Sequence, residues 1–189
     1  MYRDALLCFS GVPTAASPKP TTIIPASATT VIMPQSIDLS PLGLPTGSGG
    51  GSSALPNAGR DLGIGGEMWI QVLLATVAVS AGGGTWKVDL ITDTDQALAT
   101  AMVVLMSSPV LSNATMVAAL ASGPTSVLWR TQLPAGNSSP GGAGGTAYKA
   151  FIGLQQVVGT AGFTAGTVFA EMLTNIQAAD LFGSGYAIA

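Results

Sequence analysis

The sequence predicts an all-β protein, a β-sandwich of the jelly-roll type with an extended Pro/Gly-rich N-terminal arm and long loops. Its best-marked strand follows three successive glycines, where Trp86, Val88 and Leu90 alternate with polar residues. A period of two sends successive side chains to opposite faces of a strand, so one face is buried. Roughly seven to nine such segments recur at near-regular spacing, which is typical of sandwiches and jelly rolls.

Two β-hairpins are predicted. Residues 68–79 are apolar at nearly every position, as expected for a strand covered on both faces, although a buried helix would show the same pattern. Because glycine tolerates the positive φ that tight reversals need, the glycines at 82–84 indicate a hairpin between this segment and the alternating strand. A second hairpin is predicted between residues 148–158 and 164–176.

Proline dominates the N-terminal part of the chain. Residues 3–10 are a short strand candidate, and residues 29–39 form the best strand of this part, with Pro34 implying a bulge or an edge position. The segment 41–57 has the composition of a flexible linker or long surface loop. We therefore expect this part to be extended and poor in regular ladders.

Three further segments lie between the predicted hairpins. Residues 95–111 are compatible with a helix or a strand, and we favour a strand because both neighbours are strands. Residues 112–120 could add a short turn of helix, and residues 126–133 alternate again as a strand. We expect one domain, with an N-terminal strand and arm at 1–59 packed on a sandwich at 60–189.

The composition predicts contacts with other chains. Charged residues make up only 8% of the sequence, against about 25% in an average soluble domain, and apolar residues reach 48%. Such a chain exposes uncharged patches, which usually mark contact surfaces. The net charge of −3 and six scattered basic residues exclude a nucleic-acid footprint. Polar residues and glycines interrupt the uncharged run at 68–86, so we predict neither a membrane span nor export.

The sequence offers little apparatus for catalysis. It contains no histidine, which removes histidine-based triads and histidine-ligated zinc. The glycine runs lack the Lys-Ser/Thr of a phosphate-binding loop, so we expect no enzyme activity and no cofactor. Asp89, Asp93 and Asp95 could converge on calcium, but their spacing favours turn residues, and we predict no metal site. We expect Cys8 to be a small buried hydrophobe.

Six residues are candidates for contact with other chains. In the arm they are Ile23, Ile24, Val31 and Ile32. On the strand at 126–133 they are Trp129 and Arg130, since aromatic residues and arginine are enriched at interfaces. Core packing is the alternative for the apolar residues among them, and it is the role that we expect for the other two tryptophans, Trp69 and Trp86.

Four segments resemble one family, the capsid cement (decoration) proteins of tailed bacteriophages with short tails. They are DALLCFS (4–10), RDLGIGGEMWIQV (60–72), WKVDLITDTD (86–95) and FIGLQQVVGTAGFTAGTVFAEML (151–173). The resemblance implies a non-enzymatic jelly roll that is made in the host cytoplasm and resides on the outer capsid surface of the virion. There it would bridge major capsid protein subunits as a homo-oligomer, a dimer or trimer. The alternative function is a carbohydrate- or receptor-binding module of a virion, which would need exposed tryptophans and the aspartate cluster.

Overall fold

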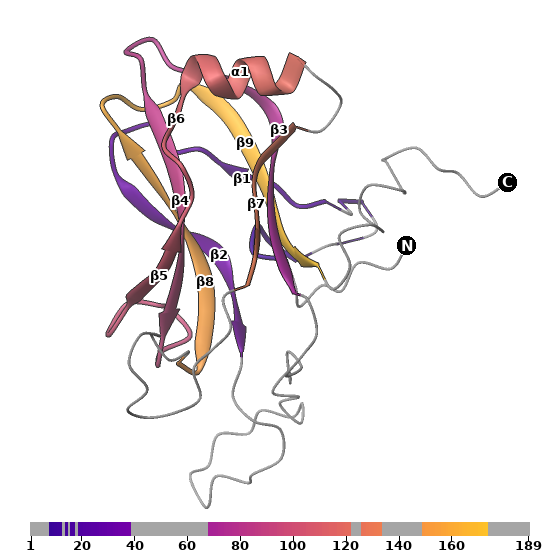
Figure 1. Cartoon of the computed structure of the whole chain (residues 1–189), viewed down its shortest axis with the longest axis vertical. Coiled ribbons are helices and arrows are strands. Elements are labelled where there is room, and N and C mark those ends of the chain that lie inside the picture. Colours follow the sequence, from indigo (N-terminus) through magenta and orange to yellow (C-terminus); the bar gives the residue numbers. More distant parts are fainter. Residues whose placement is uncertain are drawn as a thin grey trace, which may run out of the picture.

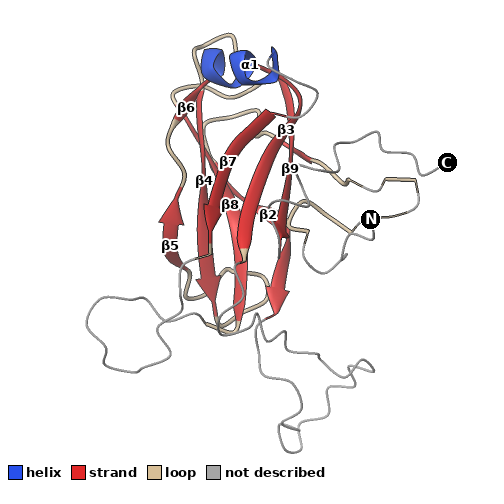
Figure 2. Cartoon of the chain, turned by 45° about the vertical axis from the view of Figure 1, so that its right-hand side comes forward, coloured by secondary structure: helices blue, strands red, loops and turns tan. Residues whose placement is uncertain are grey.

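The computed structural model describes residues 8–12, 14, 16–17, 19–38, 68–121, 126–133 and 149–173. They form two antiparallel β-sheets that face each other, with one short helix across one end (Figures 1 and 2). Sheet A contains, in order, β1 (Thr22–Ile23), β9 (Ala165–Leu173), β3 (Trp69–Val79) and β7 (Ser126–Gln132). Sheet B contains β2 (Thr30–Asp38), β8 (Phe151–Gly159), β4 (Thr85–Asp93) and β5 (Val103–Ser107), and β6 (Leu111–Ser112) also pairs with β4. The helix is α1 (Asn113–Ala121).

The core fills the space between the sheets, as the alternation in β4 predicts. Trp86, Val88 and Leu90 are fully buried and belong to one large apolar cluster. Strand β3 is buried on both faces only over residues 70–74, whereas Val77 and Val79 in its second half are 48% and 44% exposed. Its inward side chains join the same cluster, whereas Leu73 on the outer face packs with Cys8 and Phe169 in a second cluster.

Both predicted hairpins are wrong, although their strands exist. Strands β3 and β4 belong to opposite sheets, and so do β8 and β9. Trp86 of β4 lies opposite Val158 of β8, and Leu73 of β3 lies opposite Phe169 of β9. The backbone groups of each strand are thus satisfied by strands far away in the sequence, and the glycine turns carry the chain across the sandwich instead of closing a hairpin.

The connections between the sheets pack against one another at one end of the sandwich. The Ser80 hydroxyl donates to the carbonyl of Gly162 at 2.9 Å and accepts from the Gly84 backbone N–H at 2.9 Å. A Cβ atom at Gly162 would overlap the carbonyl oxygen of Ala26, in the connection between β1 and β2. Glycine is therefore required at this position because three turns approach one another closely.

The sandwich takes two strands from the segment predicted as an arm. Strands β1 and β2 lie at the edges of sheets A and B, so the sandwich includes residues before position 60. The predicted strand at 29–39 is confirmed, and Pro34 lies where the register of this edge strand shifts, between Ile32 and Ser36. The segment 41–57 and residues 3–7 lie outside the described residues.

The segments predicted at 95–111, 112–120 and 126–133 match the structure in part. The helix and the strand at 126–133 are confirmed as α1 and β7. Of the strand favoured at 95–111, only β5 and the first residue of β6 form, because residues 94–102 fold as a loop. Within the described residues, no helix is long and apolar enough to cross a membrane, and the uncharged run at 68–86 forms β3, a turn and the start of β4.

Candidate interaction surface

One side of the sandwich is built from a stretch without charge. The sequence contains no charged residue between Asp95 and Arg130. This stretch forms β5, β6, α1 and the first part of β7, so the edge strands of both sheets meet on one side, with the helix at its end (Figure 1). A contact of 3.4 Å from the Thr131 hydroxyl to the Met106 sulfur spans the two edges. We refer to residues 102–121 and 126–133 as the β5–β7 side.

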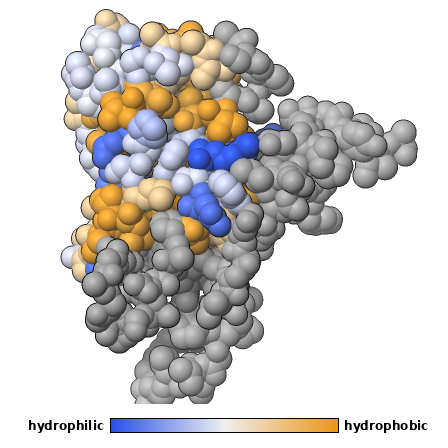
Figure 3. Space-filling view, in the orientation of Figure 1, coloured by the Kyte–Doolittle hydropathy of each residue, from blue (hydrophilic) through white to orange (hydrophobic). Residues whose placement is uncertain are grey.

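The β5–β7 side exposes apolar side chains. Val110 is 64% exposed and Val104 is 44% exposed. The other exposed large hydrophobic residues of this side are Met102, Val117 and Val127. The half-buried residues that continue the core to the surface here are Leu105, Met106, Leu111, Leu120, Leu128 and Leu133. Figure 3 shows hydrophobic surface over β5 and just below α1. An apolar surface of this kind usually marks a contact with another molecule.

The contact residues predicted from the sequence do not form one surface. Ile24 is fully buried and Trp129 is 7% exposed, so both belong to the core. Ile23, at 71% exposed, and Val31, at 39%, lie on the edge strands β1 and β2, and Ile32 is half-buried on β2. By the strand order, β1 and β2 lie on the opposite side of the sandwich from β5 and β7.

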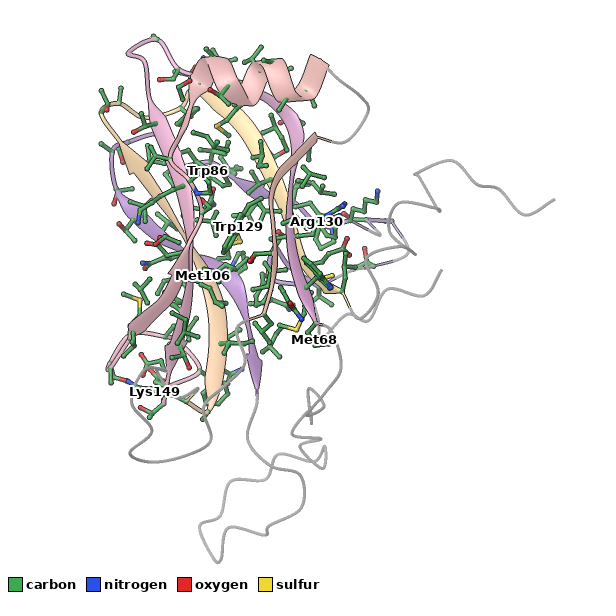
Figure 4. All side chains as sticks on the ribbon, in the orientation of Figure 1. Met68, Trp86, Met106, Trp129, Arg130 and Lys149 are labelled. Carbon is green, nitrogen blue, oxygen red and sulfur yellow. The ribbon has the colours of Figure 1, made fainter. Side chains whose placement is uncertain are left out.

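Arg130 lies on the outer face of sheet A. Its guanidinium donates to Gln71 Oε1 through Nε at 2.9 Å and through a terminal nitrogen at 2.6 Å. Gln71 also pairs with Glu171 of β9, which forms a bridge with Cys8, so a polar row crosses the outer face. In Figure 4, Arg130 extends away from the core, whereas Trp129 lies between the sheets. Cys8 is buried, as predicted.

The outer face of sheet B carries an ion pair. Lys87 Nζ donates to both carboxylate oxygens of Asp89, at 2.7 and 3.0 Å, and Gln155 Nε2 donates to Oδ2 of Asp89 at 3.2 Å. Burial raises the pKa of Asp89, but hydrogen bonds from Lys87, Ser107 and Gln155 and the charge of Lys87 outweigh it. The pKa of Asp89 therefore lies below its ordinary value of 3.8.

Asp93 organises the loop after β4. Its fully buried carboxylate accepts hydrogen bonds from the backbone N–H groups of Thr94, Asp95, Thr100 and Ala101. Burial raises the pKa of Asp93, but these N–H donors lower it by more, so the pKa lies below 3.8. The carboxylate holds the loop closed at its base.

The three aspartates considered for calcium do not converge on one point. Asp89 is paired with Lys87, and the Asp93 carboxylate is surrounded by N–H donors, whose positive ends point at the oxygens that a cation would need. Four residues along a strand separate the two by about 13 Å. No group of three or more His, Cys, Asp or Glu that could hold a metal ion exists in the part of the chain that the structure describes.

The tryptophans divide between core and partial exposure. Trp86 is fully buried, and its indole N–H donates to Gln156. Trp69, which we expected in the core, is half-buried at the start of β3 because it is the first residue of the strand. Of the tryptophans and aspartates that a glycan-binding module would present, Trp69 and Asp95 are half-buried, and the others, Trp86, Trp129, Asp89 and Asp93, are buried.

Inference from the sequence did not identify the β5–β7 side, although a signal was present. The signal is the uncharged stretch between Asp95 and Arg130. It indicates a contact surface only because the fold brings the edges of the two sheets together on this side. No protein-family model matches the chain, and no curated protein matches it.

Proposed function

We propose that the protein is a structural protein of a bacteriophage virion, which decorates the outer capsid surface and cements major capsid protein subunits. The observation that carries the proposal is the β5–β7 side, an apolar surface on a rigid sandwich in a chain with few charges. Contact surfaces between proteins are depleted in charge at their centre. The resemblance of four segments to capsid cement proteins supports the same function.

The strand order supports a jelly roll. Strands β5 and β6 both pair with β4, and Ser108 between them also bonds to β4, its N–H donating to the Val88 carbonyl at 2.8 Å. If β5 and β6 are counted as one interrupted strand, the two sheets contain eight strands in the described part of the chain. In a jelly roll, a long antiparallel hairpin is rolled up so that the first strand pairs with the eighth and the second with the seventh. With β5 and β6 together as strand 5, the strands β7, β8 and β9 become strands 6, 7 and 8. The orders expected for a jelly roll, 1-8-3-6 and 2-7-4-5, then correspond to those of sheets A and B.

A cement protein can act through contacts that are individually weak. When many copies link the subunits of one closed shell, the shell cannot open locally without breaking several contacts, so modest links add up. An uncharged surface suits this role because its burial requires no desolvation of charged groups. The sandwich supplies rigidity, and the apolar side chains of β5, α1 and β7 supply the contact.

The composition of purified virions tests the proposal. Particles from a culture that produces the protein would be banded by density and quantified by mass spectrometry. We expect the chain at a fixed ratio to the major capsid protein, and accessible to protease on intact particles. Absence from virions, or a ratio that varies between preparations, would contradict the proposal. Specific retention of the chain on a glycan resin, together with that absence, would favour the binding module.

A further inference from the structure

The connection between β4 and β5, residues 94–102, lies against the outer face of sheet B, and we refer to it as the strap. Among these residues, all within the described part of the chain, only Leu98 is buried, at 1% exposed. Its side chain lies over Gly153 of β8, because a Cβ atom at Gly153 would overlap Leu98 Cδ1. Gly153 is opposite Ile91 of β4, a fully buried residue on the same face of the strand as Asp89. Leu98 therefore covers the outer face of sheet B above this pair.

Asp93, the last residue of β4, fastens both ends of the strap. Its carboxylate accepts hydrogen bonds from the N–H groups of Thr94 and Asp95 at the first end, at 2.6 and 3.3 Å. It also accepts from those of Thr100 and Ala101 at the other end, at 3.1 and 3.0 Å. Hydrogen bonds to an ionised acceptor are stronger than those between neutral groups. The charge on one carboxylate thus holds the two ends of the strap together.

Side chains from two other segments also hold the strap, and one of its residues is strained. The Ser36 hydroxyl of β2 donates to the carbonyl of Gln96 at 2.9 Å. Lys149, labelled at the lower end of the molecule in Figure 4, donates through Nζ to the carbonyl of Ala101. Leu98 has a φ of +55°, in the left-handed region that is unfavourable for a residue with a Cβ atom. Segments held by side chains instead of a strand ladder open before the rest of a fold.

We propose that the strap is an acid-released device, closed over sheet B while the Asp93 carboxylate is ionised and detached when it is protonated, with both sheets still folded. A protonated carboxyl group has no charge and carries a proton on one of the oxygens that the N–H groups need. Detachment lets Leu98 leave the left-handed region and uncovers Ile91. On its other side Ile91 is opposite Val104 of β5, which is 44% exposed. Opening of the strap therefore extends the apolar surface of β5 across sheet B.

The sign of the pH dependence follows from the groups around Asp93. Burial raises its pKa, but the N–H donors of the strap lower it by more, so the pKa lies below 3.8. Since those donors are lost on opening, closure is lost as the pH falls through the folded pKa. The other charged residues nearby are Asp95 in the strap, Lys149 before β8, and Asp38 at the end of β2, on the far side of β8. Strand β5 carries no charge, and Lys149 bonds to a carbonyl oxygen, which does not titrate.

Amide hydrogen exchange of the full chain, followed by NMR and corrected for the intrinsic effect of pH, tests the release. We expect the N–H groups of Thr100 and Ala101 to be protected at pH 6 and to lose protection below about pH 4. The N–H groups at the centre of β4 and β8 should stay protected over the same range. Retention of strap protection at pH 2 would overturn the role of Asp93. Simultaneous loss across sheet B would show that the strap does not open separately.

Two variants should release the strap at pH 6. Asp93→Asn should speed exchange at the far end of the strap by about tenfold or more, since it removes the charge that strengthens those hydrogen bonds. Gly153→Ala should act in the same direction, because its methyl group displaces Leu98 while the nearest backbone atom beyond the flanking residues, the Gln35 oxygen, lies 3.9 Å away. The control is Asp95→Asn, whose carboxylate accepts from the Ala97 N–H at 3.3 Å and should leave that exchange unchanged.

The variants also define what would contradict the device. Unchanged exchange in Gly153→Ala would show that Leu98 does not hold the strap, and release by Asp95→Asn would assign the fastening to another carboxylate. If Asp93→Asn does not fold, the pH series of the wild type and Gly153→Ala decide the question. The inference concerns the isolated protein, so its failure leaves capsid binding open, and absence from virions leaves the strap open to test.

Discussion

The indole Nε1 of Trp86 donates a 3.0 Å hydrogen bond to Oε1 of Gln156 inside the sandwich. The amide Nε2 of Gln156 in turn donates to the Ile23 carbonyl at 3.1 Å. Trp86 and Gln156 belong to sheet B, whereas Ile23 belongs to sheet A, so one buried amide links the two sheets. A buried polar group that is satisfied in this way stabilises the fold and fixes the relative position of the sheets.

Replacing Gln156 with leucine should lower the free energy of unfolding by about 1–3 kcal/mol, because the Trp86 N–H loses its acceptor in the core. Urea denaturation measures the change. The matched control is Gln132→Leu, at an exposed position of β7, which should stay within about 0.5 kcal/mol of the wild type. Equal free energies of unfolding for the two variants would show that the buried amide of Gln156 does not stabilise the fold.

Replacing Gly162 with alanine should cost about 3 kcal/mol of stability, since the new methyl group meets the backbone of Ala26, which cannot rotate away. Gly83→Ala is the control. Gly83 has a φ of +67°, and no atom lies within 4 Å of the place that a methyl group would take, so alanine there costs only the left-handed strain of about 1 kcal/mol. Thermal unfolding of both variants gives the comparison. A smaller loss at Gly162 than at Gly83 would contradict the close packing of the three turns.

Two adjacent isoleucines should respond differently to truncation. Ile24 is fully buried, so Ile24→Ala should lower the free energy of unfolding by about 2–5 kcal/mol. Ile23 is 71% exposed, so Ile23→Ala should change it by less than about 0.5 kcal/mol. Denaturant titration measures both. A large loss for Ile23→Ala in the isolated protein would mean that its side chain is covered.

Stability should fall in acid because two carboxylates have a depressed pKa in the folded protein. The pKa values of Asp89 and Asp93 lie below 3.8 in the folded protein, so as the pH falls the unfolded chain binds more protons than the folded protein does. Their contribution is complete above the ordinary pKa and is lost as the pH falls through the folded pKa. Urea midpoints measured from pH 6 down to pH 2 should therefore decrease mainly below about pH 4.

The variant Asp93→Asn distinguishes the contribution of Asp93 to the acid-dependent loss of stability from that of Asp89. It should lower stability at neutral pH, because an amide supplies only one acceptor oxygen to the N–H groups of the loop, and it should weaken the acid dependence. Asp95→Asn, in the same loop, is the control and should retain the acid-dependent loss, since Asp93 remains. An unchanged pH profile for Asp93→Asn would show that the Asp93 carboxylate does not contribute to it.

The strands could be predicted from the sequence, but their pairing could not. Alternation at Trp86, Val88 and Leu90 reports a buried face, which is a local property. Which strand supplies the hydrogen-bond partner is a non-local property, and the glycines of the turns are equally compatible with a hairpin and with a crossing between sheets. Pro34 was informative because a missing N–H directly restricts a strand to an edge or a bulge.

The contact surface was harder to predict than the fold. Ile23 and Ile24 have the same side chain, and only the pairing of β1 with β9 decides which is exposed and which is buried. Trp129 faces the core because strand β7 lies with that face against the other sheet. The β5–β7 side becomes one surface only when edges of both sheets lie together, which a linear sequence does not reveal.

The most direct test of the central claim is the temperature at which capsids release DNA, measured by dye fluorescence on particles stripped of the protein and then given it back. We predict that the wild type rebinds and raises this temperature. Val31→Lys should act like the wild type, whereas Val117→Lys on α1, at a matched exposure of 38% against 39%, should bind less and protect less. Full rebinding of the wild type without any rise in the release temperature, or equal protection by Val117→Lys, would contradict the account.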